Sequence, residues 1–133
     1  MTSQNIPTNP FEPNAASGKI AVVSGASSGI GRATVEQMRA TGWTVYAVAR
    51  RTERLEELSR QTGATAVPLD ITDENAVKKA ATRILKETGG VLHALVNISG
   101  GAIGIDSVQE GKSDQWLEMF RLNVLGTLHM TQA

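Results

Sequence analysis

The stretch Ile20-Ala21-Val22-Val23-Ser24-Gly25-Ala26-Ser27-Ser28-Gly29-Ile30-Gly31 decides the fold of this chain. Its first four residues form a short, continuous apolar run, which is typical of a β-strand buried on both faces. A glycine-rich turn follows, and apolar residues then recur at helical spacing through Met38. A buried strand, a glycine turn and a helix in this order predict the first unit of an open α/β sheet.

The same alternation continues along the rest of the chain. Further strands are expected at residues 44–49, 65–69 and 92–96. Helices are expected to begin at Thr52 and Thr72, each threonine acting as an N-cap, and after Ser113. Strands that alternate with helices are joined as parallel neighbours by right-handed crossovers. The sequence therefore predicts a Rossmann-like, doubly wound parallel sheet of the order β-α-β-α-β-α-β-α.

Composition removes several classes of partner. The chain has 133 residues, with 13 basic and 13 acidic side chains and no cysteine. A net charge of zero does not provide the excess of basic side chains that is typical of proteins that bind nucleic acids or membrane surfaces. No segment reaches the length of a membrane span, and His93 and His129 stand apart from any ligand-spaced cluster. We expect no nucleic-acid or membrane partner, no metal site, and a cytoplasmic location.

The segment from Gly25 to Gly31 has the chemistry of a phosphate-binding loop. Glycines let the backbone turn sharply and approach a phosphate closely, and the N–H groups of the following helix favour negative charge. Ser27 and Ser28 add hydroxyl donors. The loop is not a Walker A motif, because Gly31 is followed by Arg32-Ala33 rather than by Lys-Ser/Thr. An ordinary glycine-rich turn is the alternative interpretation.

The string from Ser24 to Gly31 resembles the Thr-Gly-x-x-x-Gly-x-Gly motif of the classical short-chain dehydrogenases/reductases. The resemblance runs from about Lys19 to the C-terminus and implies a dinucleotide-binding domain over residues 19–133, preceded by a flexible leader over residues 1–18. It also implies that the loop residues touch a bound NAD or NADP: Gly25, Ser27, Ser28, Gly29, Ile30 and Gly31.

Arg50 and Arg51 favour NADP over NAD. An NAD site usually places an acidic residue at the end of the second strand, where it binds the ribose 2′-hydroxyl. Here that end reads Ala49-Arg50-Arg51. Two arginines before a helix N-terminus are reasonable if an anion lies between them and the helix, and arginine binds phosphate well. We expect Arg50 to make most of the contact with the 2′-phosphate and Arg51 to assist it; the alternative is that both are simply solvated.

Four further cofactor contacts follow from the resemblance. Asp70-Ile71 follows the third strand, where the family holds the adenine, although Asp70 could instead only help to start the next helix. The fourth strand is followed by Asn97-Ile98-Ser99-Gly100, where the family has Asn-Asn-Ala-Gly. Asn97 and Gly100 match the family pattern, whereas Ile98 and Ser99 do not. The backbone hydrogen bonds of the family's second asparagine are therefore lost or replaced in this turn.

Asn123 matches the asparagine of the family's catalytic tetrad. The serine, tyrosine and lysine of that tetrad have no counterpart in this chain. Its one tyrosine, Tyr46, lies on a strand, where the spacing to Arg50 separates the two side chains by about 13 Å. We therefore interpret Tyr46 as a packing residue. We also expect missing sequence after Ala133 and no turnover by the 133 residues alone.

The last helix carries more apolar residues than one buried stripe needs, which predicts a partner helix. The resemblance implies a homo-oligomer through this helix and an alcohol or carbonyl substrate for the complete enzyme. It implies an oxidoreductase that transfers a hydride to or from NADP. The alternative is a noncatalytic nucleotide-binding or dimerising module. A methyltransferase-like sheet is disfavoured, because Ala49-Arg50-Arg51 lacks the ribose-binding acid of such a site.

Overall fold

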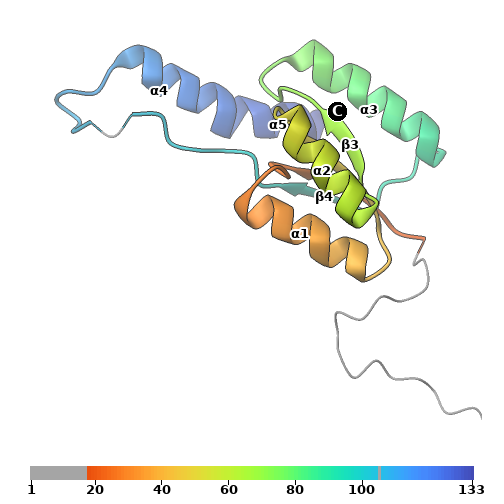
Figure 1. The fold of residues 1–133 in the computed structure, drawn as a ribbon. Coiled ribbons are helices and arrows are strands. Elements are labelled where there is room, and N and C mark those ends of the chain that lie inside the picture. The colour runs from red at the N-terminus through yellow and green to blue at the C-terminus, as the bar shows by residue number, and fades with distance from the viewer. Residues whose placement is uncertain (1–17, 105) are drawn as a thin grey trace, which may run out of the picture.

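The structure is a computed structural model that describes residues 18–104 and 106–133 (Figure 1). Its four strands form one parallel sheet in the order β3-β2-β1-β4. The strands are β1 (Ile20–Ser24), β2 (Thr44–Ala49), β3 (Thr65–Pro68) and β4 (Ala94–Asn97). The helices are α1 (Gly29–Ala40), α2 (Thr52–Thr62), α3 (Glu74–Thr88), α4 (Ser113–Phe120), the π-helical segment η1 (Arg121–Leu125) and α5 (Gly126–Gln132).

This arrangement confirms the predicted Rossmann-like fold. The predicted leader, residues 1–18, lies outside the described residues apart from Gly18.

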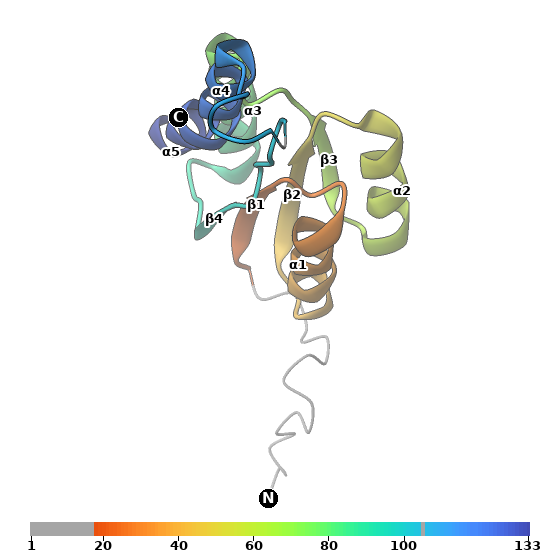
Figure 2. The same cartoon turned by 90° about the vertical axis from the view of Figure 1, so that its left-hand side faces the viewer.

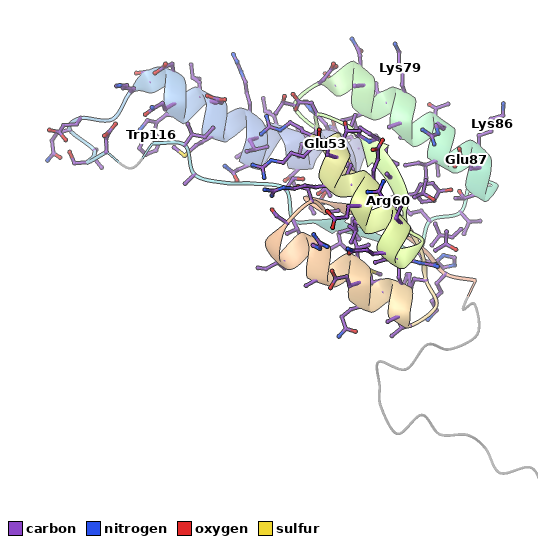
Figure 3. All side chains as sticks on the ribbon, in the orientation of Figure 1. Glu53, Arg60, Lys79, Lys86, Glu87 and Trp116 are labelled. Carbon is purple, nitrogen blue, oxygen red and sulfur yellow. The ribbon has the colours of Figure 1, made fainter. Side chains whose placement is uncertain are left out.

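Helices cover both faces of the sheet (Figure 2). Alternate residues of each strand face opposite layers. On β1, Val23 packs with the core beneath α1 and α2, whereas Val22 packs with the core beneath α3 and α5. On β2, Ala47 joins the first core and Val48 the second. Burial on both faces explains why these strands are continuous apolar runs. Charged side chains of α2 and α3, including Arg60 and Lys79, point outward (Figure 3).

Two helices begin differently from the prediction. Asp73, and not Thr72, is the N-cap of α3, because its carboxylate accepts a hydrogen bond from the backbone N–H of Ala76 at 3.1 Å. The hydroxyl of Thr72 is already engaged with Asp70. Thr52 is the first residue of α2, and Arg51 is its N-cap without a side-chain cap bond. Both expected positions were wrong by one residue. At α3 the reason is that Thr72 bonds to Asp70 and leaves Asp73 to cap the helix.

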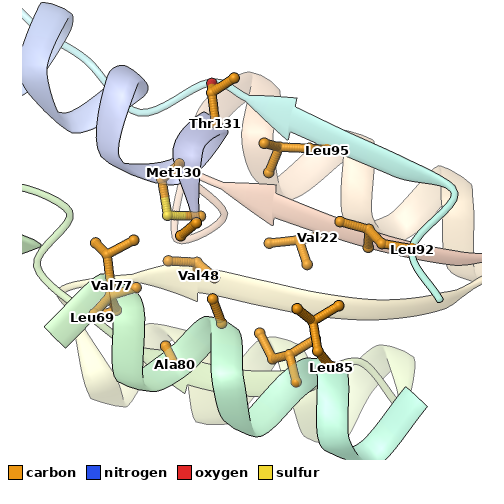
Figure 4. Close-up of a pocket in the computed structure, with 13 residues that line it drawn as sticks. Val22, Val48, Leu69, Val77, Ala80, Leu85, Leu92, Leu95, Met130 and Thr131 are labelled. Atoms are coloured by element: carbon orange, nitrogen blue, oxygen red, sulfur yellow. The ribbon is translucent and has the colours of Figure 1, made fainter. Parts of the chain in front are cut away.

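β4 begins and ends later than the predicted strand over residues 92–96, and β3 ends one residue earlier than predicted, at Pro68. β4 pairs only with β1 among the described strands. Beside it, an apolar groove opens between α3, the sheet and α5 (Figure 4). Its lining includes Val22, Leu85, Leu92, Leu95 and Met130.

The last helix is one run with a π-helical turn in its middle. α4 projects from the body of the molecule and leads through η1 into α5, which packs beside α3 (Figures 1 and 2). Residues on α4 stay largely exposed, including Trp116 at 58% and Leu117 at 57%. Among the described residues, no helix combines the length and the apolar character that a membrane crossing requires.

Candidate functional site

A polar cleft lies where the strands end and the helices of the next units begin. It brings together nine of the twelve cofactor contacts predicted from the sequence. These nine are Gly25, Ser27, Ser28, Ile30, Arg50, Arg51, Asp70, Ile71 and Gly100. Ala49, Leu69, Ile98, Ser99 and Leu122 complete the lining. The carboxyl edge of a parallel sheet is where open α/β folds bind their ligands.

The loop after β1 and the first turn of α1 need glycine at several positions. Gly25 has φ +69°, and a Cβ there would stand 2.7 Å from the backbone nitrogen of Ser99. A Cβ on Gly31 would run into the backbone carbonyl of Gly25. Gly31 is not among the residues that line the cleft. Its missing side chain lets α1 pack directly under the loop. Gly29 also lies outside the lining and has φ +58°.

The N-terminus of α1 opens toward this loop. Ser28 is the N-cap residue, with an extended backbone and no hydrogen bond from its side chain to the helix. Together with Ser27, it lines the cleft. The first turn of α1 contains no acidic residue. Free N–H groups at a helix start, without a competing carboxylate in that turn, suit a phosphate.

Arg50 and Arg51 form the wall of the cleft between β2 and α2. Both side chains are exposed, and both line the cleft. The structure places them immediately after β2, as predicted, with Arg51 at the N-cap of α2. Arg50 lies close enough to Asp70 for its charge to contribute to lowering the carboxyl pKa.

Asp70 forms the adjoining wall. Its Oδ1 accepts hydrogen bonds from the backbone N–H of Thr72 at 3.0 Å and from the Thr72 hydroxyl at 2.7 Å. The hydroxyl bond is the main reason that the pKa of Asp70 lies below its ordinary value; partial burial opposes the shift, and Arg50 adds to it. Asp70 thus both lines the cleft and shapes the turn before α3.

Ser24 is a structural residue that the sequence analysis missed. It is fully buried at the end of β1. Its Oγ accepts hydrogen bonds from the backbone N–H groups of Ile98 at 3.2 Å and Ser99 at 3.4 Å. It therefore ties the loop after β4 to the strand that precedes the glycine loop. A hydroxyl residue closing an otherwise apolar strand was the available signal.

Asn123 does not line the cleft. It binds the loop that follows β4, next to the cleft residue Gly100. Its Oδ1 accepts from the backbone N–H of Gly101 at 2.9 Å, and its Nδ2 donates to the carbonyl of Gly101 at 2.8 Å. A Cβ on Gly100 would stand 2.5 Å from the Asn123 Oδ1, so this approach requires glycine. Asn123 lies in η1, and π-helical turns often mark functional positions.

Asn97 is the third predicted contact outside the cleft lining. Its Nδ2 lies 3.5 Å from the hydroxyl of Thr131 on α5. Tyr46 is confirmed as a packing residue, since it is only 6% exposed and its hydroxyl donates to Glu87 at 3.0 Å. Burial and this hydrogen bond raise the pKa of Tyr46. Within the described residues, no three acidic or histidine side chains gather closely enough to bind a metal.

The model of one protein family, short chain dehydrogenase, matches residues 19–133. The chain belongs to this family. An uncharacterized oxidoreductase of Mycobacterium tuberculosis is 44% identical over 115 residues, which cover 86% of this chain and 44% of the relative. Serine 3-dehydrogenase of Rhizobium radiobacter is 38% identical over 112 residues, covering 83% of this chain and 45% of the relative.

A solved structure agrees with the family assignment. The citronellol catabolism dehydrogenase of Pseudomonas aeruginosa superposes with a TM-score of 0.83 at 29% identity, over 93% of this chain and 52% of that one. The chain thus spans about half the length of the family members that it matches.

Proposed function

We propose that this chain is the NADP-binding portion of an oxidoreductase that transfers a hydride between NADP(H) and an alcohol or carbonyl compound. The observation that carries the proposal is one cleft lined by the glycine loop, by Arg50 and Arg51, and by Asp70. Family membership supports a nicotinamide dinucleotide as the ligand. The activity and the substrate class of the whole protein are part of this proposal.

Each wall of the cleft suits one part of the dinucleotide. The backbone at Gly25 and the N-terminus of α1 suit the pyrophosphate, because both bring N–H groups without bulky side chains. The guanidinium groups of Arg50 and Arg51 suit the ribose 2′-phosphate, which they can bind through charge-assisted hydrogen bonds. Asp70 suits the adenine because its carboxylate is an acceptor, and Ile71 lines the same wall of the cleft.

NADP fits this site better than NAD. An acidic residue that would bind the 2′-hydroxyl of NAD is missing after β2, where Arg50 and Arg51 stand instead. When bound, the nicotinamide would supply or accept the hydride. Asn123 would hold the loop after β4 in place beside it, through Gly101. The cytoplasmic location stays a prediction from the sequence.

A second candidate function is a noncatalytic nucleotide-binding or dimerising module. The exposed apolar side chains of α4, Trp116, Leu117 and Phe120, favour it. The same surface supports the proposal that the protein forms a homo-oligomer through its last helix. NADPH-dependent reduction of a carbonyl compound by the protein that the complete gene encodes would decide for the enzyme; folded, dimeric protein without turnover would decide for the module.

Arg50→Ala tests the choice of cofactor. A charge-assisted hydrogen bond to phosphate contributes about 1.5–3 kcal/mol, so this variant should bind NADPH about 10- to 100-fold more weakly. Its affinity for NADH should stay close to the original. Arg60→Ala is the matched control, because Arg60 lies in the last turn of α2, away from the cleft. Unchanged NADPH affinity in Arg50→Ala would refute the assignment of the 2′-phosphate to this side chain.

A further inference from the structure

His129 on α5 holds the segment that forms one wall of the cleft. Its ring Nδ1 lies 2.9 Å from the backbone carbonyl oxygen of Ile71. Because a carbonyl oxygen only accepts, Nδ1 must carry the hydrogen and donate. The contact joins residues 58 positions apart in the chain and is partly buried. It therefore fixes the turn after β3 to a helix from the other end of the chain.

Gly126 strengthens the same contact, one turn earlier on α5. It is buried, and a Cβ there would stand 2.7 Å from the Cδ1 of Ile71. Ile71 itself is only 4% exposed and belongs to the core beneath α3 and α5. The missing side chain of Gly126 leaves room for the side chain of Ile71, while His129 binds its carbonyl. Gly126 and His129 together hold Ile71 in place.

The last helix thus holds two segments that line the cleft or adjoin its lining. Through Asn123 it binds Gly101, next to the cleft residue Gly100. Through His129 it binds Ile71, which lines the cleft beside Asp70. Because Asp70 is itself tied to Thr72, the whole turn from Asp70 to Thr72 is held at several points.

We infer that His129 is a positioning residue for the adenine side of the cleft, acting through Ile71 with Gly126. This inference rests on the proposed function, since it takes an adenine nucleotide as the ligand. A turn that is already fixed before binding loses less conformational freedom when the nucleotide arrives, which strengthens binding. His129 itself would not touch the ligand, because it is not part of the cleft lining.

The test measures the dissociation constants of ADP and NADPH for the protein that the complete gene encodes. His129→Leu keeps the bulk and removes the donor; it should weaken both ligands about fivefold, the worth of one hydrogen bond. His129→Asn places an amide nitrogen near the position of Nδ1 and should restore most of the affinity. Both ligands should respond equally, because both carry the adenine.

His93→Leu is the matched control. The Nδ1 of His93 accepts a hydrogen bond from the backbone N–H of Ile20 at 3.0 Å, at the start of β1 and thus away from the cleft. This variant should lower the melting temperature without changing either dissociation constant. If His93→Leu weakens binding as much as His129→Leu does, the effect is general destabilisation and the inference is wrong.

The remaining outcomes separate the inference from the proposed function. Wild-type protein that binds neither NADPH nor ADP would overturn both. Wild-type binding with equal binding by His129→Leu would overturn the inference alone. If His129→Leu fails to fold, Gly126→Ala takes its place: the added methyl must displace Ile71, so binding of ADP should weaken. Equal binding of ADP by Gly126→Ala and wild type would then overturn the inference.

Discussion

Asp70 has two roles, one in the turn before α3 and one in the lining of the cleft. Its carboxylate accepts two hydrogen bonds from Thr72, which shapes the turn before α3. The same side chain lines the cleft near Arg50, whose charge adds to the lowering of its pKa. A residue that helps to start a helix can therefore also be placed for a ligand, because the turn itself forms the wall.

The lowered pKa of Asp70 predicts how stability depends on pH. A carboxyl whose pKa is lower in the folded than in the unfolded protein stabilises the fold above its unfolded value, about 3.9. That contribution is lost as the pH falls through the lower, folded value. The free energy of unfolding of wild type should exceed that of Asp70→Asn at neutral pH, and the two should converge below about pH 4. Urea unfolding across this range measures it; a difference that grows on acidification would contradict the assignment.

At the scale of elements, the close packing of α1 under the glycine loop depends on Gly31. A Cβ at this position would meet the carbonyl of Gly25, a backbone atom that cannot rotate away. Gly31→Ala should therefore destabilise the fold by about 2 kcal/mol, typical of overpacking, and weaken NADPH binding. Gly101→Ala is the control, because a Cβ there meets nothing within 4 Å. Equal stability of the two variants would show that the loop can move to accommodate a Cβ at residue 31, and would contradict the prediction.

Elements with a strong pattern could be predicted from the sequence, and their ends could not. β2 spans residues 44–49 as predicted, because its residues 45–49 form an apolar run that is buried on both faces of the sheet. The start of α3 was misplaced because Thr72 and Asp73 can both cap a helix, and only the contact with Asp70 decides which does. The π-helical turn around Asn123 has no local signature in the sequence. The contacts of Ser24 and His129 join distant segments, so no spacing predicts them.

In the molecule as a whole, α4 projects from the body and has no buried residue. Phe120 is 51% exposed, beside Trp116 and Leu117 on the same projecting helix. A contiguous apolar surface of this kind is typical of an interface between protein chains. The proposed homo-oligomer would bury it.

Phe120→Asp tests this surface. A charge in the centre of an apolar interface should raise the dissociation constant of the oligomer by about tenfold or more. Val108→Asp is the control, since Val108 is 84% exposed but lies in the loop before α4. Sedimentation equilibrium of both variants measures the shift. If Phe120→Asp and wild type have the same mass distribution, the interface lies elsewhere.

The central claim is that the cleft beside Arg50 and Arg51 binds NADP through its 2′-phosphate. Titration calorimetry of the protein with NADPH and with NADH tests it most directly. We expect saturable binding of one NADPH per chain and clearly weaker binding of NADH, because only NADPH carries a ribose 2′-phosphate for the two arginines to bind. Equal affinity for the two dinucleotides, or binding of neither, would contradict it.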